Sequence, residues 1–148
     1  MATRTQRHRF LALGTPLGDD VLLLQAMEGT ERVGACFRYD LEMVSERTDI
    51  LFEDLVGRNV TVRLNREGTE PAYFNGIVRR FGLVDVSEGV ARYRATVVPW
   101  LWLLTRTADC RIFQNLTVPE IIQSVFRERG LVDFENRLAA AYRTWDYC

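Results

Sequence analysis

The chain has 148 residues, 47% of them hydrophobic, which is enough for one sizeable core and hardly for two. Its formal net charge of -1 provides no positive field for nucleic acid or anionic lipid, so neither is expected as a partner. All 19 basic residues are arginine, which excludes a phosphate-loop lysine, a Schiff base and a Ser-Lys dyad.

The histidine and cysteine content argues against further kinds of catalytic and metal site. The single histidine, His8, cannot form a two-histidine zinc site, and no serine lies in a hydrolase motif. Cys36, Cys110 and Cys148 are odd in number and widely separated, which fits neither a disulfide framework nor a metal knuckle. We interpret them as reduced thiols of a cytoplasmic protein, and we predict no catalytic residue, cofactor or metal site.

The N-terminal segment does not read as an export signal. It is basic at Arg4, Arg7 and Arg9, but the apolar stretch 10–13 is shorter than a signal-peptide core of about 7 to 15 residues. The longest apolar run, 97–104, is well below the roughly 18 residues that cross a bilayer. If the protein leaves the cell, we expect it to do so without a signal peptide.

The first strands are predicted at 7–13 and 21–27, on either side of the turn-rich segment 14–20. That segment contains a Gly-x-x-x-Gly pattern, but the aspartates after it would repel phosphate, so we interpret it as a turn. Its acidic pair, Asp19 and Asp20, and a second pair, Glu53 and Asp54, are candidates for acid-base or cation chemistry. Neighbouring acids in turns usually face water, and we favour that interpretation.

A third strand begins at Phe37, where the residues alternate with period two. The face toward the core carries Phe37, Tyr39, Leu41 and Met43. Asp40 and Glu42 share the other face with Arg38, a pattern suited to cross-strand ion pairs with arginines such as Arg92 or Arg94. We interpret these charges as surface pairs or as a subunit contact.

Residues 49–56 predict a short helical turn, with Thr48 or Asp49 as N-cap and Gly57 as its left-handed end. Segments 59–64 and 73–83 then predict a hairpin, in which Gly76 would mark a bulge or a bend.

A polar link at 85–89 leads into Val90–Val98, whose alternation turns one face toward the core. The residues of that face are Ala91, Tyr93, Ala95 and Val97. The total of about six strands favours a barrel or a sandwich.

Pro99 opens a predicted short helix over 99–105, apolar on all sides and expected to be buried against the sheet. Trp100 and Trp102 fit a core position first, an interface second and a ligand site third. The third option supports a rival hypothesis, a small β-barrel enzyme or ligand-binding protein with its pocket at these tryptophans.

The clearest helix signal lies at 117–130. Thr117 and Glu120 form a capping box, apolar residues follow at helical spacing, and Gly130 supplies the stop. Alternation over 134–140 hints at one more strand. The chain ends at Cys148 without a polar tail, which suggests truncation inside a second domain.

Six segments, in order along nearly the whole chain, closely resemble the VgrG family of type VI secretion spike proteins. They are Phe37–Glu42, Leu55–Val62, Tyr73–Val78, Tyr93–Thr105, Cys110–Asn115 and Thr117–Ile122. The resemblance implies a mainly β protein: an antiparallel barrel of the phage tail-hub type, with a short helix and one amphipathic helix packed on it. It also implies a first hub barrel over 1–106, and over 107–148 a connecting helix with the start of a second, truncated hub domain.

The resemblance further implies a non-enzymatic spike component. Three copies would form a pseudo-sixfold base that docks on the hexameric Hcp tube, with effectors or adaptors carried along and a PAAR tip protein bound through regions outside this chain. Such a protein is cytoplasmic before assembly and is then secreted by the type VI machinery. The alternative is the baseplate hub of a contractile phage or phage-like particle.

Overall fold

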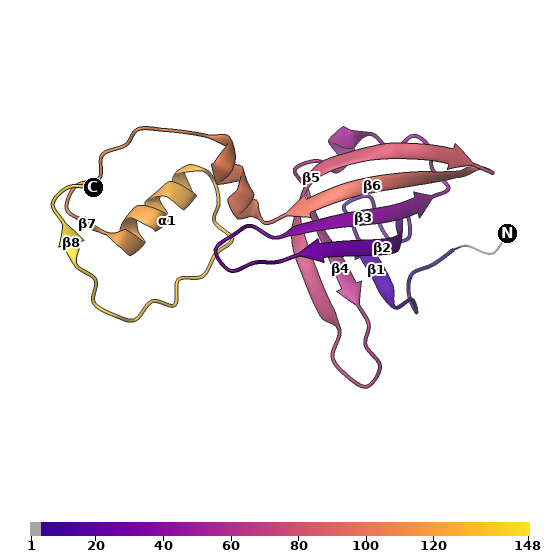
Figure 1. The fold of residues 1–148 in the computed structure, drawn as a ribbon, viewed down its shortest axis with the longest axis horizontal. Coiled ribbons are helices and arrows are strands. Elements are labelled where there is room, and N and C mark those ends of the chain that lie inside the picture. Colours follow the sequence, from indigo (N-terminus) through magenta and orange to yellow (C-terminus); the bar gives the residue numbers. More distant parts are fainter. Residues whose placement is uncertain (1–3) are drawn as a thin grey trace. The chain divides into compact units, whose positions relative to one another are not determined.

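The computed structural model describes residues 4–148, and the chain divides into two compact units that meet between Leu104 and Thr105 (Figure 1). The first unit is a six-stranded, fully antiparallel sheet with the order β1-β4-β5-β6-β3-β2. Its strands are β1 (Leu11–Gly14), β2 (Leu23–Thr30), β3 (Arg38–Ser45), β4 (Asn59–Leu64), β5 (Ala72–Ser87) and β6 (Val90–Val98). The predicted strand count and antiparallel barrel are confirmed.

The core lies inside this curled sheet and is centred on β6. Every second residue of that strand, from Ala91 to Val97, is buried, as the alternation predicted. Tyr93 is fully buried, and the ring of Phe81 on β5 stacks on it with centroids 5.1 Å apart. Burial of each large apolar side chain contributes about 1.5–3 kcal/mol, so these side chains are the main support of the barrel.

The sheet is nearly closed, and a buried glutamine spans the seam between its two end strands, β1 and β2. Gln6 is only 5% exposed. Its Oε1 accepts hydrogen bonds from Leu13 N (2.9 Å) and Leu24 N (3.1 Å), while its Nε2 donates to Leu13 O (3.1 Å). The first strand therefore begins at Leu11, later than predicted, because the chain before it turns so that Gln6 can enter the seam.

Strand β5 is longer than predicted, and its register irregularities lie beyond Gly76. Its register with β6 shifts between Val78 and Arg80 and again between Leu83 and Asp85. Of the bulge or bend predicted at Gly76, the bulge is wrong, because the pairing of β5 with β4 is regular there. This glycine lies where β6 comes close, and a Cβ there would be 2.6 Å from Val98 O.

The predicted polar link at 85–89 is also mostly strand. β5 runs to Ser87, and the chain reverses at Glu88 and Gly89, which both have positive φ (52° and 74°). Two consecutive positive φ values match the twist of a two-residue hairpin.

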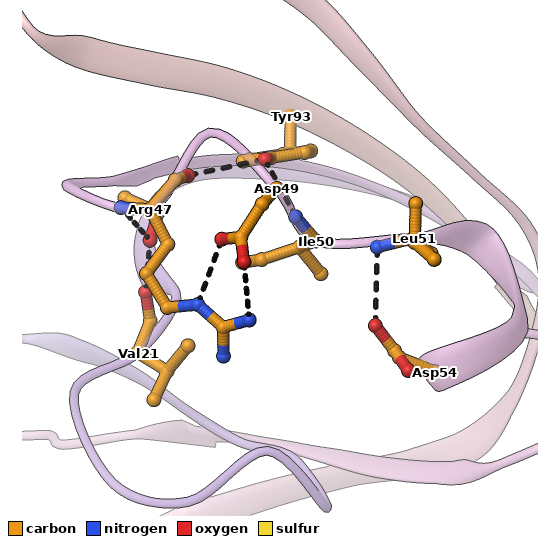
Figure 2. A network of polar contacts seen from close by, with 8 residues as sticks. Val21, Arg47, Asp49, Ile50, Leu51, Asp54 and Tyr93 are labelled. Carbon is orange, nitrogen blue, oxygen red and sulfur yellow. Dashed lines mark hydrogen bonds and ion pairs between the residues drawn. The ribbon is translucent and has the colours of Figure 1, made fainter.

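The segment after β3 is held by the phenol of Tyr93 (Figure 2). Tyr93 Oη donates to Arg47 O (3.1 Å) and accepts from Ile50 N (3.4 Å), and the Ser45 hydroxyl, buried nearby, donates to Val21 O (2.6 Å). These bonds connect the segment 45–50 with Val21 and with the buried side chain of Tyr93.

The predicted helical turn at 49–56 is a shorter 3-10 helix, η1 (Phe52–Asp54), and neither predicted cap residue caps it. Asp54 accepts from Leu51 N (3.1 Å), whereas Asp49 pairs with Arg47 at 3.0 Å. Gly57 has the predicted left-handed conformation, with a φ of 81°, but the helix ends before it, with Leu55 as its C-cap.

The predicted helix at 99–105 is a 3-10 helix, η2 (Trp100–Arg106). The prediction that it is buried against the sheet is wrong for part of its surface. Leu101 and Leu103 are 44% and 41% exposed, and the tryptophans are half-buried. The Arg79 guanidinium lies 4.9 Å from the Trp102 ring centroid and ties η2 to β5. An arginine therefore covers a side chain that sequence reasoning assigned first to an apolar core.

The second unit contains β7 (Leu116–Thr117), α1 (Val118–Glu128) and β8 (Thr144–Trp145), with β7 and β8 paired. The capping box is confirmed: Thr117 N donates to Glu120 Oε2 at 2.7 Å, and Glu120 N donates back to Thr117 Oγ1 at 3.4 Å. Gly130, with a φ of 70°, follows the helix as predicted.

The strand predicted at 134–140 is wrong, because Phe134 packs edge to face on Phe126 of α1 (5.1 Å between centroids) rather than joining a sheet. Phe113 and Cys148 instead exchange two backbone hydrogen bonds of 2.8 Å.

Replacing the seam glutamine should destabilise the barrel strongly. In Gln6→Ala two buried backbone N–H groups lose their acceptor, at a cost of about 1–3 kcal/mol each. We expect chemical unfolding to show a free energy of unfolding lower by at least about 2 kcal/mol. Arg7→Ala, at an exposed neighbouring position, should leave it nearly unchanged; equal stability of both variants would contradict the role of Gln6.

Two glycines of the same strand provide a matched test of backbone approach. Gly76→Ala forces a methyl group against Val98 O, whereas a Cβ at Gly82 meets nothing within 4 Å. We expect Gly76→Ala to lower the thermal unfolding midpoint by several degrees, as for a loss of about 1–3 kcal/mol, and Gly82→Ala to preserve it. Equal midpoints would contradict the close approach of β6.

Candidate interaction surfaces

Alternation on β3 and β6 turns a row of charged side chains to the outside of the barrel. Arg94 donates to Glu42 at 2.6 Å, as predicted, while Arg38 pairs with Asp40 at 2.8 Å. Arg92 does not join them and lies 3.5 Å from Asp85 of β5. Each exposed pair contributes at most about 1 kcal/mol, so this face gains little stability from its charges.

A polar groove of about 790 Å³ runs over this charged face. Ala26 and Gly82 keep it open, and its charges alternate in sign, with Glu28 on β2 and Arg80 on β5. Among residues 4–148 no group of three or more His, Cys, Asp or Glu side chains could hold a metal ion. The groove has the charged lining of a contact surface.

One member of each acidic pair singled out in the sequence accepts a backbone hydrogen bond. Asp20 Oδ1 accepts from Gln6 N at 2.8 Å, and this bond, with one from Thr5, holds the pKa of Asp20 below its usual value. Asp54 caps η1 through Leu51 N. Each pair thus has a member that holds a backbone N–H group in place.

The three cysteines are free thiols in the structure. Cys36 is half-buried, while Cys110 and Cys148 are exposed. The barrel interior is filled by side chains such as Tyr93, Leu41 and Met43, which argues against the rival hypothesis of a small β-barrel enzyme or ligand-binding protein with its pocket at Trp100 and Trp102.

The far half of β5 has an open edge. β4 pairs only with residues 72–77, and Val56 bridges to Val78. Beyond that point, within the described part of the chain, β5 pairs with β6 alone. Leu83, Val84 and Val86 on this half are 49%, 47% and 49% exposed. An unpaired edge with apolar side chains is a site for strand addition or packing by another chain.

The near end of β5 contributes to a cleft of about 510 Å³ that we call the aromatic cleft. Its lining residues are Glu31, Arg32, Ala35, Phe37, Tyr39, Tyr73, Phe74 and Asn75. Phe37 stacks on Tyr39 (4.6 Å between centroids), Phe74 meets Tyr39 edge to face (5.5 Å), and Tyr73 is 63% exposed. The Tyr39 hydroxyl donates to the Glu31 carboxylate.

Sequence reasoning missed the seam, the open edge and the cleft. Phe37 and Tyr39 were assigned to one face, and the adjacent aromatics Tyr73 and Phe74 were a second local signal, but neither indicates that the two strands converge. Gly29, which pairs with Tyr39, was a third local signal, because a Cβ at this position would lie 3.1 Å from the Tyr39 ring.

The barrel, its order of strands and its filled core can be compared with known families. Residues 30–148 match the model described as the phage tail baseplate hub (GPD). The chain belongs to this family. The fold class inferred from the sequence, an antiparallel barrel of the tail-hub type, is thereby confirmed.

Curated relatives of this hub-family chain are named as spike proteins. It is 49% identical to the type VI secretion system spike protein VgrG1a of Pseudomonas aeruginosa, over 97% of this chain and 22% of that protein. It is 31% identical to the actin cross-linking toxin VgrG1 of Vibrio cholerae, over 80% of this chain and 12% of the toxin. The chain thus spans about a fifth or less of these relatives' length.

A solved structure agrees with this assignment. The E. coli c3393 protein, described as a type VI secretion component similar to the T4 phage tail proteins gp27 and gp5, superposes with a TM-score of 0.71 at 25% identity. The match covers 86% of this chain and 35% of c3393. No helix among residues 4–148 has the length and apolar character of a membrane span.

Tyr39 of the aromatic cleft should make the free energy of unfolding depend on pH in the alkaline range. Burial, reinforced by Glu31, raises the pKa of Tyr39 from 10.0 to about 12. Between these values the folded state keeps a proton that the unfolded state has lost, so the free energy of unfolding falls as pH rises. The stabilisation is complete below pH 10 and is lost as pH passes about 12.

We expect urea unfolding across this pH range to show a smaller decline for Tyr39→Phe than for the native chain. Identical declines would contradict the raised pKa.

Proposed function

We propose that this chain is a non-catalytic hub segment of a type VI secretion spike. In this proposal it assembles as a homotrimer, and the trimer docks on the hexameric Hcp tube to help deliver effectors. The observation that carries the proposal is the hub barrel with the open edge of β5, in a chain nearly half identical to a VgrG spike protein.

The open edge supports an assembly role on physical grounds. Exposed strand edges with apolar side chains promote aggregation unless a partner covers them. In a cyclic trimer one surface of each copy meets a different surface of the next, so every edge is covered once. The charged outer face supports the same role, because its paired arginines and carboxylates tolerate partial burial at a subunit contact.

The second unit supports the proposed domain organisation, with a first barrel over 1–106 and the start of a second hub domain over 107–148. Val118 and Ile122 of α1 are 48% and 45% exposed, and Leu138 is 57% exposed. More of a second domain would cover these apolar groups. Effectors, adaptors and a PAAR tip protein would then bind regions outside this chain.

A non-enzymatic role is consistent with the relative named as an actin cross-linking toxin. The match covers only 12% of that protein, so the activity in its name does not follow for the matched part. Among residues 4–148 no group of three or more His, Cys, Asp or Glu side chains is placed to hold a metal ion. We also propose that the protein is made in the cytoplasm and leaves through the type VI machinery.

The second candidate is the baseplate hub of a contractile phage or phage-like particle, which the description of the matched family favours. The barrel would serve the same structural purpose there. Gene neighbourhood separates the two: sheath and membrane-complex genes of a secretion system support the spike, and capsid genes support the phage hub.

The test is the absolute mass, by light scattering, of the protein expressed to its natural stop codon. We expect a trimer. Val84→Asp with Val86→Asp places charges on the open edge and should raise the concentration of half-dissociation about tenfold or more. Leu51→Asp, at an apolar position 61% exposed on another segment, is the matched control and should leave the mass unchanged.

A native protein that stays monomeric over a wide concentration range would overturn the proposed trimer. Equal effects of the edge variant and its control would remove β5 from the interface.

A further inference from the structure

The aromatic cleft has the chemistry of a site for a flat cation. Phe37, Tyr39 and Phe74 form a packed aromatic cluster, and exposed Tyr73 adds a ring that a partner can reach. Glu31 adds a carboxylate whose Oε1 is engaged by Tyr39. Its Oε2 has no hydrogen-bond partner among residues 4–148. Aromatic faces attract cations, and a carboxylate beside them adds direct charge attraction.

An apolar occupant fits this cleft poorly. Covering Glu31 with apolar groups would strip water from a carboxylate that no described cation neutralises, at a large desolvation cost. Arg32 lies at the rim, but it forms no ion pair with Glu31 in the structure. The occupant should therefore supply a positive charge together with a planar, apolar surface, and guanidinium combines both.

The chain already uses this pairing in two other places. The Arg79 guanidinium lies over Trp102 at 4.9 Å, and that of Arg143 lies over Trp145 at 4.2 Å from the ring centroid. All 19 lysine-or-arginine positions of residues 1–148 are arginine, so this part of a second copy offers guanidinium groups to its neighbour. The cleft presents the aromatic half of the same pairing, and among the described residues its own Arg32 lies over none of these rings.

We infer that the aromatic cleft receives an arginine side chain from a neighbouring copy of this protein. The inference rests on the proposed homo-oligomer. In a cyclic assembly the cleft of one copy faces a different surface of the next, so a cleft needs no counterpart beside it on the same face. Arginine and tyrosine are also the residue types that carry much of the binding energy at interfaces.

The experiment places a photo-crosslinking residue in the cleft of the full-length protein, as Ala35→p-benzoylphenylalanine. Ala35 lines the cleft and is exposed, so the aromatic side chains and Glu31 stay in place. Copies carrying two different tags are co-expressed, irradiated and digested, and the crosslinked peptides are identified by mass spectrometry. We expect a crosslink between differently tagged copies, to a peptide whose attachment point lies beside an arginine.

Two further variants test whether the cleft itself captures the arginine. Tyr73→Ala should lower the crosslink yield about tenfold, as for loss of one interface anchor, and Glu31→Gln should lower it as well. Phe10→Ala removes an equally exposed aromatic side chain (65% against 63% for Tyr73) outside the cleft and should preserve the yield. Unchanged thermal unfolding midpoints establish that all variants are folded.

Light scattering separates the failure of this inference from that of the proposed function. A trimer that gives only intramolecular crosslinks, crosslinks to another protein, or intermolecular crosslinks away from any arginine would overturn the arginine site and leave the trimer intact. A yield unaffected by Tyr73→Ala and Glu31→Gln would do the same. A monomeric native protein would overturn both.

Discussion

Three hydrogen bonds from one buried side chain join the two ends of the sheet, and the rest of the first unit depends on this closure. β1 and β2 lie at opposite ends of the strand order and share no backbone ladder. Gln6 takes the place of that ladder by accepting from one amide on each strand. Once the seam is held, the apolar faces of the strands pack into one core inside the curled sheet.

The sequence predicted the parts of this fold that follow from local periodicity. Alternation over Val90–Val98 and from Phe37 onward placed the central strands, and the Thr117–Glu120 box placed the start of α1. The errors arose where contacts between distant parts of the chain determine the local structure. The approach of β6 to Gly76, the entry of Gln6 into the seam and the packing of Phe134 on Phe126 all depend on tertiary contacts. Residue spacing carries no signal for such contacts.

The candidate surfaces were harder to predict for the same reason. A charged strand face is visible in the sequence, and the pairing of Glu42 with Arg94 was predicted from it. The open edge of β5 exists only because β4 is shorter than its partner, which is a property of two strands together. The aromatic cleft likewise brings Phe37 and Tyr39 of one hairpin against Phe74 of another.

The two surfaces lie toward opposite ends of the same strand. Tyr73 and Phe74 are near the start of β5, and Val84 and Val86 are near its end, which at about 3.3 Å per residue places the two pairs roughly 40 Å apart along the strand. A cyclic assembly requires two different patches on each copy, one for each neighbour. A nearly closed, filled barrel offers such patches only on its outside. β5, which extends beyond its pairing with β4, contributes to both patches while the core stays intact. The length of β5 therefore links the packing of the barrel to its proposed role as a subunit of a ring.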